Sequence, residues 1–324
     1  MVTSQTWMFI SSFEAIRKCL ISSVTILTLC DTKSTGLHAD NFTANAAFSV
    51  LNGQLKEYKA SYFKLDQPIE QKPARLLEAL ADPECGWFYR ADADGFGAIP
   101  GSPIAYWASS SALGAFENAP AVSAFMNSCS GITTGDTRFV SYWHEVELSK
   151  IGFNCTTWQD MGKSTWFPLN SGGEFRLFYG NNEKIVNLYN GGEAIRASGG
   201  NYRLRDKTNY FKKGLTWGRI TSSDIAFRST APGTLFGDAG PVGFTGEEHY
   251  YLLGFLTSAL LRYFVNVLNP TLNCQIADIE RVPLLIDEQK KEQVEVLVTD
   301  CIENEADDWN AVETSWDFKR HPLA

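Results

Sequence analysis

The 324-residue sequence has few of the side chains that metal and redox sites need. It contains four histidines, and neither His144-Glu145 nor Glu247-Glu248-His249 is joined by further ligands at metal-binding spacing. The seven cysteines are scattered and never form a C-x-x-C pair. This pattern argues against a disulfide framework or a structural zinc site, and it favours a reducing, cytoplasmic location.

Long apolar runs and common catalytic motifs are missing as well. The N-terminal apolar run at residues 19–30 is too short to cross a bilayer, so we expect no membrane partner. The sequence has no phosphate-binding P-loop and no G-x-S-x-G nucleophile turn. The dense glycine segment at residues 94–97 leads into Pro100 and Pro103 rather than into a helix, which predicts a loop and not a cofactor site.

Positive charge is scarce overall but concentrated in one region. The formal net charge is -9, yet residues 131–230 carry 13 Lys/Arg against 9 Asp/Glu. From Arg196 to Arg228 eight basic residues stand against two acidic ones, whereas residues 280–318 carry twelve acids and three bases. Because the local field decides what binds to a face, an acidic chain can still present a basic surface.

Length and composition indicate a globular chain of about two domains. Aromatic residues make up 13% of the sequence, which favours β-rich or binding architecture over a helical bundle. Apolar periodicity, Ser11 or Ser12 as a helix cap, and the Asn269-Pro270 stop give the clearest local signals. They predict helices at 13–20, 249–268 and 287–303, strands at 24–29 and 45–51, and a short strand or turn at 276–285.

Aromatic, amide and cationic side chains alternate between residues 166 and 228. Such groups bind phosphates, stack on bases and contact base edges, so the region is a candidate nucleic-acid surface. The candidate phosphate ligands are Arg138, Arg203, Arg205, Lys207, Lys212 and Lys213. The alternative is a solvated basic loop with core aromatics, and for Trp143 the core is the favoured location.

Several stretches resemble one enzyme family in the same order. Residues 5–17, Q-T-W-M-F-I-S-S-F-E-A-I-R, look like the segment that follows the N-P-P-Y catalytic motif in the PglX family. These are the adenine-specific DNA methyltransferases of BREX phage-defence systems, related to type IIG restriction–modification enzymes. The other similar stretches are 99–107, 134–146, 166–182, 210–228, 252–258, 268–275 and 308–322.

The resemblance implies an α+β layout with two parts and a helical extension. Residues 1–55 would be the last part of a Rossmann-like methyltransferase core, and 56–98 a connector. Residues 99–283 would form a mixed, β-rich target recognition domain that binds double-stranded DNA, and 284–324 the start of a helical spacer. Within that domain the resemblance makes Arg176, Asn181 and Asn182 candidates for base-edge contacts, and Trp217 and Arg219 further DNA contacts.

The sequence departs from the family at its chemical motifs. The family binds S-adenosylmethionine at a glycine motif and methylates a flipped-out adenine at N-P-P-Y, but no Asn-Pro-Pro occurs here. We therefore expect no catalytic or cofactor-binding residue in this chain, and an upstream methyltransferase polypeptide or other BREX components as partners. The alternatives are a non-catalytic specificity module or decayed fragment, and a β-rich carbohydrate- or ligand-binding protein.

Overall fold

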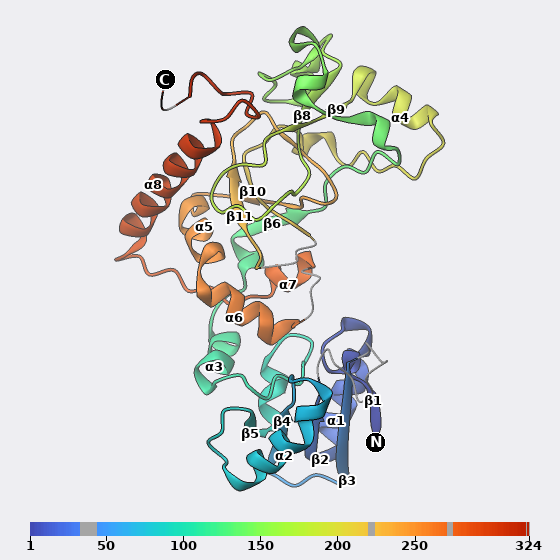
Figure 1. Ribbon diagram of the computed structural model, residues 1–324, viewed down its shortest axis with the longest axis vertical. Helices are drawn as coiled ribbons and strands as arrows, with labels where there is room; N and C mark the ends of the chain where they lie inside the picture. The colour runs from blue at the N-terminus through green and yellow to red at the C-terminus, as the bar shows by residue number, and fades with distance from the viewer. Residues whose placement is uncertain (33–43, 220–223, 271–274, 322, 324) are drawn as a thin grey trace. The chain divides into compact units, whose positions relative to one another are not determined.

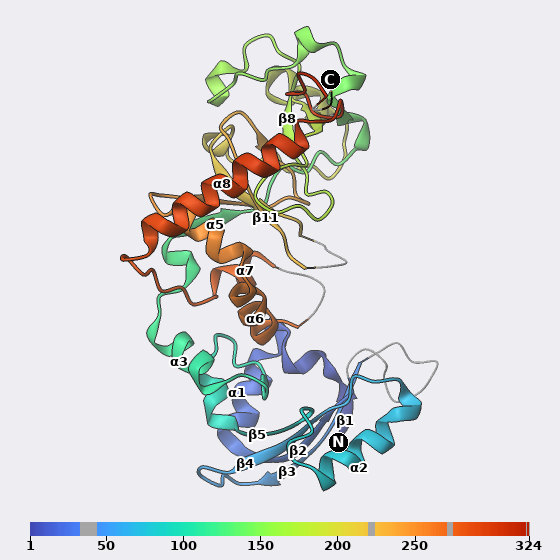
Figure 2. The ribbon, with the colours of Figure 1, turned by 60° about the vertical axis from the view of Figure 1, so that its left-hand side comes forward.

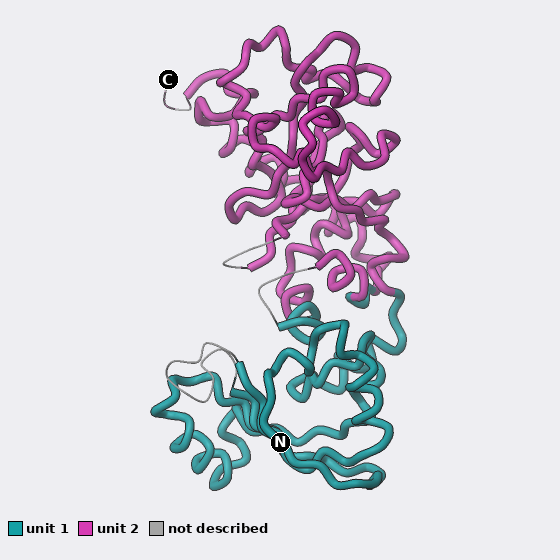
Figure 3. Tube along the Cα trace, turned by 90° about the vertical axis from the view of Figure 1, so that its right-hand side faces the viewer, with its two compact units in different colours: residues 1–120, 264–270, 282–284 teal, residues 121–263, 271–281, 285–324 magenta. Residues whose placement is uncertain are grey.

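The computed structural model describes residues 1–324 except 33–43, 220–223, 271–274, 322 and 324 (Figure 1). The described residues form three β-sheets together with α-helices and short 3-10 turns, in agreement with the predicted α+β class. The chain divides into two compact units (Figure 3). Unit 1 comprises Met1–Pro120, Phe264–Pro270 and Val282–Leu284; unit 2 comprises Ala121–Tyr263, Thr271–Arg281 and Leu285–Ala324.

Unit 1 is built on a five-stranded sheet with the order β1-β3-β2-β4-β5. Its strands are β1 (Val2–Ser4), β2 (Val24–Asp31), β3 (Asn45–Asn52), β4 (Lys59–Lys64) and β5 (Phe88–Asp92). The β2–β4 pair is parallel, whereas the other neighbouring strands are antiparallel. The predictions of strands at 24–29 and 45–51 are thus confirmed.

Helices α1 (Glu14–Ser23) and α2 (Lys72–Ala81) cover opposite faces of this sheet (Figure 2). Tyr62 packs in the same cluster as Leu20 of α1, whereas Phe63 packs with Ala79 of α2. Successive residues of a strand point to opposite faces, so this alternation along β4 places one helix on each side. The helix predicted at 13–20 is therefore confirmed.

The segment at 56–98 is not the connector we expected. It supplies β4, α2 and β5 to the sheet of unit 1, and that unit continues through α3 (Ser110–Asn118) to Pro120. The strands are short and their flanks are rich in charged residues, so the apolar alternation within them is a weak sequence signal. The assignment of this lobe as Rossmann-like stays a prediction.

Buried polar side chains hold the N-terminal segment of unit 1 in place. Arg17 is 1% exposed, and its guanidinium donates to the carbonyls of Trp7, Ile10 and Gly101. A buried charge is tolerated only when its donors are satisfied, and three backbone acceptors meet that need. The cation therefore fastens the turns before α1 to the loop at Gly101.

Unit 2 contains two four-stranded sheets of short strands. The antiparallel sheet has the order β11-β10-β13-β6, from β11 (Phe227–Thr230), β10 (Gly214–Trp217), β13 (Val242–Thr245) and β6 (Met126–Cys129). The mixed sheet has the order β12-β8-β9-β7, from β12 (Leu235–Phe236), β8 (Trp166–Asn170), β9 (Lys184–Asn187) and β7 (Val140–Tyr142). Here β12 and β8 run parallel.

The helices near the C-terminus differ from their predicted bounds. The helix expected at 249–268 is split into α5 (His249–Thr257) and α6 (Ala259–Leu268), because Ser258 adopts an extended backbone. A helix, α7 (Ile276–Glu280), replaces the predicted strand or turn, and its first turn is closed by a reciprocal Gln275–Asp278 cap. Helix α8 (Lys291–Trp309) confirms the charged helix and packs against α5 (Figure 2).

The length and apolar character of the described helices bear on whether they could span a membrane. No single helix among them is long and apolar enough to cross a bilayer, although α5 and α6 taken together, bent by 70°, pass the same test of length and composition.

His249, at the start of α5, joins that helix to the antiparallel sheet. Its Nε2 lies 2.8 Å from the hydroxyl of Ser229 in β11, and its Nδ1 lies 2.7 Å from the hydroxyl of Thr245 in β13. The side chain is 5% exposed. Burial, reinforced by the neighbouring charge of Lys213, lowers the pKa of His249 to about 4, so the imidazole is neutral at physiological pH.

This lowered pKa predicts a loss of stability in mild acid. The unfolded histidine takes up a proton near pH 6.5 while the folded one resists until about pH 4, so stability falls progressively across that window, by up to about 3 kcal/mol. Urea unfolding of the wild type and His249→Asn between pH 7 and 4 measures this. The variant should be less stable at pH 7 but lack that part of the acid slope. The exposed His144→Asn serves as control, and equal slopes in wild type and His249→Asn would contradict the assignment.

Candidate nucleic-acid interface

Three strand ends meet on one face of unit 2. Strands β8, β10 and β12 end at Asn170, Trp217 and Phe236, and the segments that follow line two adjacent hollows of about 630 and 350 Å³. The hollows share Ser171, Asp238 and Ala239. We call them together the strand-end groove, which is lined from 132–137, 140–142, 171–173, 218–219 and 237–239, with Glu145, Leu169, Lys184 and Gln275.

Asn170 joins the three strand ends. Its side-chain oxygen lies 3.2 Å from the hydroxyl of Thr216 in β10 and 3.3 Å from the amide nitrogen of Gly172. Its backbone carbonyl accepts a hydrogen bond from the amide of Gly237, directly after β12, at 2.7 Å. Since Asn170 is 1% exposed, these bonds are shielded from water and fix the floor of the groove.

The Gly172-Gly173 pair forms one wall of the groove in a conformation that favours glycine. Their φ angles are 86° and 105°, and the Gly172 carbonyl accepts from Asn181 Nδ2 at 3.0 Å and Arg228 Nη2 at 3.1 Å. A Cβ at Gly173 would lie 2.6 Å from Asn181 Nδ2. Arg228 is 1% exposed, and burial lowers its pKa to about 10, which leaves it a cation at neutral pH. The loop is thus held from two sides.

One carboxylate positions two arginines at the groove. Asp238 Oδ2 lies 2.8 Å from Arg219 Nη1, and its Oδ1 lies 3.6 Å from Arg205 Nη2. Arg205 also donates from Nε to the carbonyl of Gly131 at 2.8 Å. The triad carries a net positive charge, and the carboxylate restricts the rotamers of both cations.

Two more cations border the groove. Lys184 lines it and lies 5.8 Å from the ring centre of Tyr142. The exposed Arg138 is paired through Nε with Asp136 at 2.8 Å. The lining carries Lys184 and Arg219 against Asp136, Glu145 and Asp238. Arg138 and Arg205 beside it bring the site to four cations against three acids, a small positive excess of the sign that binding of a polyanion needs.

The structure therefore brings part of the predicted set together. Arg138, Arg205 and Arg219 lie at the groove, and the backbone of Arg203 pairs with Thr133 in its wall, with an exposed side chain. Lys207, Lys212 and Lys213 are exposed but do not line the groove. They lie near Trp158, Asn209 and Tyr250, respectively. Their role as phosphate ligands stays a prediction.

Other predicted contacts are removed by burial. Trp217 is 0% exposed and packs against Phe227, with ring centres 5.1 Å apart, so its expected contact with DNA is wrong. Asn181 is 9% exposed and uses Nδ2 for the carbonyls of Gly172 and Glu174. It supports the groove from inside. Its amide is not available to a base edge.

Arg176 and Trp143 contact the C-terminal segment. Arg176 pairs with Asp308 at 3.0 Å and lies 5.0 Å from the ring centre of Trp309 on α8. Trp143, expected in the core, is half-buried and donates from Nε1 to the carbonyl of Thr314 at 2.8 Å. Both side chains fix α8 and the segment after it to the sheet region of unit 2.

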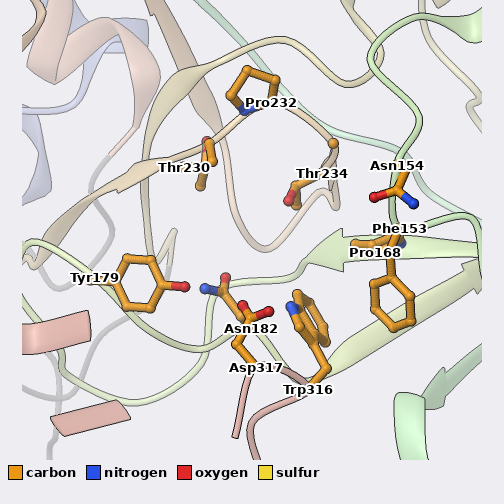
Figure 4. Close-up of a pocket in the computed structure, with 12 residues that line it drawn as sticks. Phe153, Asn154, Pro168, Tyr179, Asn182, Thr230, Pro232, Thr234, Trp316 and Asp317 are labelled. Atoms are coloured by element: carbon orange, nitrogen blue, oxygen red, sulfur yellow. The ribbon is translucent and has the colours of Figure 1, made fainter. Parts of the chain in front are cut away.

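Asn182 lines a separate cavity of about 380 Å³ (Figure 4). Figure 4 shows it beside Tyr179 and Asp317, with Trp316 and Phe153 forming an aromatic side. Among the described residues no lysine or arginine lines this cavity, so its lining lacks the charge needed for a phosphate. The predicted base contacts Arg176, Asn181 and Asn182 therefore do not share one surface.

Sequence reasoning missed two residues of the groove. Asp238 is an acid, and from the sequence alone an acid is expected to repel the phosphates of DNA. Only the structure shows that it pairs with two arginines. Lys184 lies outside the basic cluster, and its only sequence signal is its place beside the aromatic and amide residues that precede it. The missing information in both cases is the pairing of the strands.

Gly173→Ala tests the rigidity of the groove wall. The added methyl group meets Asn181 and the positive φ disfavours alanine, so unfolding should become easier by about 1–3 kcal/mol. Urea unfolding measures this change. Gly114→Ala in α3 is the matched control, because its Cβ meets no atom within 4 Å and alanine favours a helix. A Gly173→Ala protein as stable as the wild type would contradict this wall geometry.

Comparison with known proteins identifies relatives among adenine-specific methyltransferases. The chain is 33% identical over 337 residues to the adenine-specific methyltransferase PglX of Lacticaseibacillus casei (strain Zhang), covering 100% of this chain and 28% of that protein. It is 31% identical over 331 residues to the adenine-specific methyltransferase BrxX of Escherichia coli O9:H4 (strain HS), covering 99% of this chain and 26% of that protein. The chain thus spans little more than a quarter of the curated relatives it matches. No family model matches it.

Among solved structures, the type IIL restriction–modification enzyme MmeI, determined in complex with DNA, shares the fold. The TM-score is 0.57 at 10% sequence identity, over 98% of this chain and 42% of that one. The type IIG restriction endonuclease BpuSI also matches over 92% of this chain and 41% of that one, with a TM-score of 0.33 and 12% identity. The resemblance seen in the sequence is confirmed: along its whole length this chain is a relative of the adenine-specific methyltransferases PglX and BrxX.

Proposed function

We propose that this chain carries DNA target recognition for a site-specific adenine-N6 DNA methyltransferase of the BREX type. The observation that carries the proposal is the strand-end groove in a chain of net charge -9. Lys184 and Arg219 line it, and Arg138 and Arg205 border it through their ion pairs with Asp136 and Asp238. The similarity to PglX and BrxX supports an adenine methyltransferase, and the fold shared with a DNA-bound enzyme supports duplex DNA as the partner.

The groove offers two kinds of contact to a duplex. Arg138 and Arg203, exposed at its edges, are suited to phosphates, which fix position without selecting sequence. Thr133, Thr134 and Ser171 line its interior with hydroxyls, of which that of Thr134 donates to the carbonyl of Asp136 and keeps its capacity to accept. Such groups contact base edges in the major groove, where every base pair has its own pattern.

We propose that unit 1 by itself does not hold S-adenosylmethionine, the methyl donor of this family. Asp31, the acid at the carboxyl end of β2, is buried and accepts from Gln5 and Tyr106. We propose that the isolated chain binds DNA without transferring a methyl group, and that a partner methyltransferase polypeptide provides the cofactor site and the N-P-P-Y loop.

Labelled S-adenosylmethionine tests whether this chain only binds DNA and leaves methyl transfer to a partner. The isolated chain, incubated with the label and duplex DNA, should leave the DNA unlabelled, while a well-characterised adenine methyltransferase labels the same duplex as positive control. Transfer of the label to adenine by the isolated chain would refute this part of the proposal.

The salt dependence of DNA binding tests the groove itself. Each lost phosphate contact lowers the slope of log K against log salt by about 0.9, so Arg138→Ala/Lys184→Ala should flatten it by about one to two units. The separately predicted Lys212→Ala/Lys213→Ala should flatten it too. The control Lys18→Ala/Lys290→Ala removes two exposed charges outside the groove. Equal flattening by the control would mean that net charge alone sets the slope. An unchanged slope in either double variant would mean that its two residues make no phosphate contact and are simply solvated.

A further inference from the structure

We infer that Arg219, oriented by Asp238, recognises a guanine in the DNA target. This inference rests on the proposed function and names one base that the strand-end groove selects. It is carried by the geometry of the Arg205–Asp238–Arg219 triad and by the lack of side chains on the glycines beside it.

Arg219 has one edge of its guanidinium occupied and another available. Nη1 donates to Asp238 Oδ2 at 2.8 Å, and the backbone amide of Arg219 donates to the carbonyl of Ala239 at 3.1 Å. Within the described part of the chain, Nε and Nη2 have no hydrogen-bond partner. The side chain is 42% exposed and lines the 350 Å³ hollow. The Nε–Nη2 edge is a two-donor fork of the kind that pairs with two adjacent acceptors.

Asp238 is itself fixed, so it can orient its partner. Its amide donates to the carbonyl of Ile132 at 3.0 Å, and its Oδ1 contacts Arg205, which is anchored in turn on Gly131. An arginine held in this way has already lost most of its rotamer freedom before DNA arrives. Binding therefore costs less conformational entropy. A base that does not meet the fixed direction of the guanidinium gains less binding free energy from it.

The electrostatics favour a base over a phosphate at Arg219. The carboxylate of Asp238 lies beside the guanidinium and repels an incoming phosphate, whereas guanine O6 and N7 are neutral acceptors spaced for a two-donor fork. Adenine presents an N6 donor where guanine presents O6, so it opposes one of the two N–H groups. Gly172, Gly173 and Gly218 line the same hollow without side chains and leave room for the edge of a base.

Selection from a randomised duplex library by the 324-residue chain tests the inference. Arg219→Lys keeps the charge but removes the fork. The preference for guanine at one position should therefore fall about tenfold or more, with the other preferences and the salt slope unchanged. Asp238→Asn, which keeps the shape and weakens the hold on Arg219, should reduce the same preference several-fold.

Arg262→Lys is the matched control. Arg262 donates from Nη1 to Asp224 at 2.9 Å and is 46% exposed, but it does not line the groove, so its substitution should leave every preference intact. Sequence-selective binding with an unchanged guanine preference in Arg219→Lys would overturn this inference alone. A uniform loss of affinity across sequences would make Arg219 a phosphate contact and also overturn it. A wild-type chain that binds no DNA would overturn the proposed function as well.

Discussion

The carbonyl of Gly172 is the acceptor on which the arrangement of unit 2 depends. It receives hydrogen bonds from Asn181 and from the buried cation of Arg228, and this pair holds the loop after β8 against β11. Placing a guanidinium at 1% exposure costs desolvation energy, which the structure offsets because Arg228 also donates to the carbonyl of Arg176. Together with the bonds of Asn170 to Gly172, Thr216 and Gly237, these hydrogen bonds fix the path of the loop beside the ends of β8, β10 and β12.

Burial divides these arginines into two groups with different roles. Arg17 and Arg228 are buried and donate to backbone carbonyls, so they stabilise segments and are unavailable to a ligand. Arg205 and Arg219 remain accessible, and the acid between them fixes their direction while leaving a net positive charge. Net charge alone therefore says little about binding, because the position of each acid determines whether it opposes a cation or orients it.

The sequence predicts the elements whose apolar period is long and continuous, and it fails where tertiary pairing decides. The periodicity correctly indicated β2, β3, α1 and α8, but the β4 and β5 strands lie among charged residues, and the α5–α6 break depends on one extended residue, Ser258. For the site, an exposed arginine such as Arg219 is identifiable from its basic neighbourhood. The sequence does not distinguish an amide that binds a base from one, such as Asn181, that binds its own backbone. The prediction that Trp217 contacts DNA is wrong for a related reason, because a tryptophan at a strand end can face either the core or the solvent.

The groove separates residues that hold the fold from residues whose side chains are partly exposed and bear little of the packing. Asn170, Gly172, Asn181 and Arg228 determine the loop geometry through buried bonds, whereas Thr133, Ser171 and Arg219 are partly exposed and contribute little to the core. Substitution at exposed loop positions costs little stability, while loss of a buried, satisfied polar group costs much. Under the proposed function, a recognition surface built in this way changes its target through its exposed residues while the strand ends stay in place.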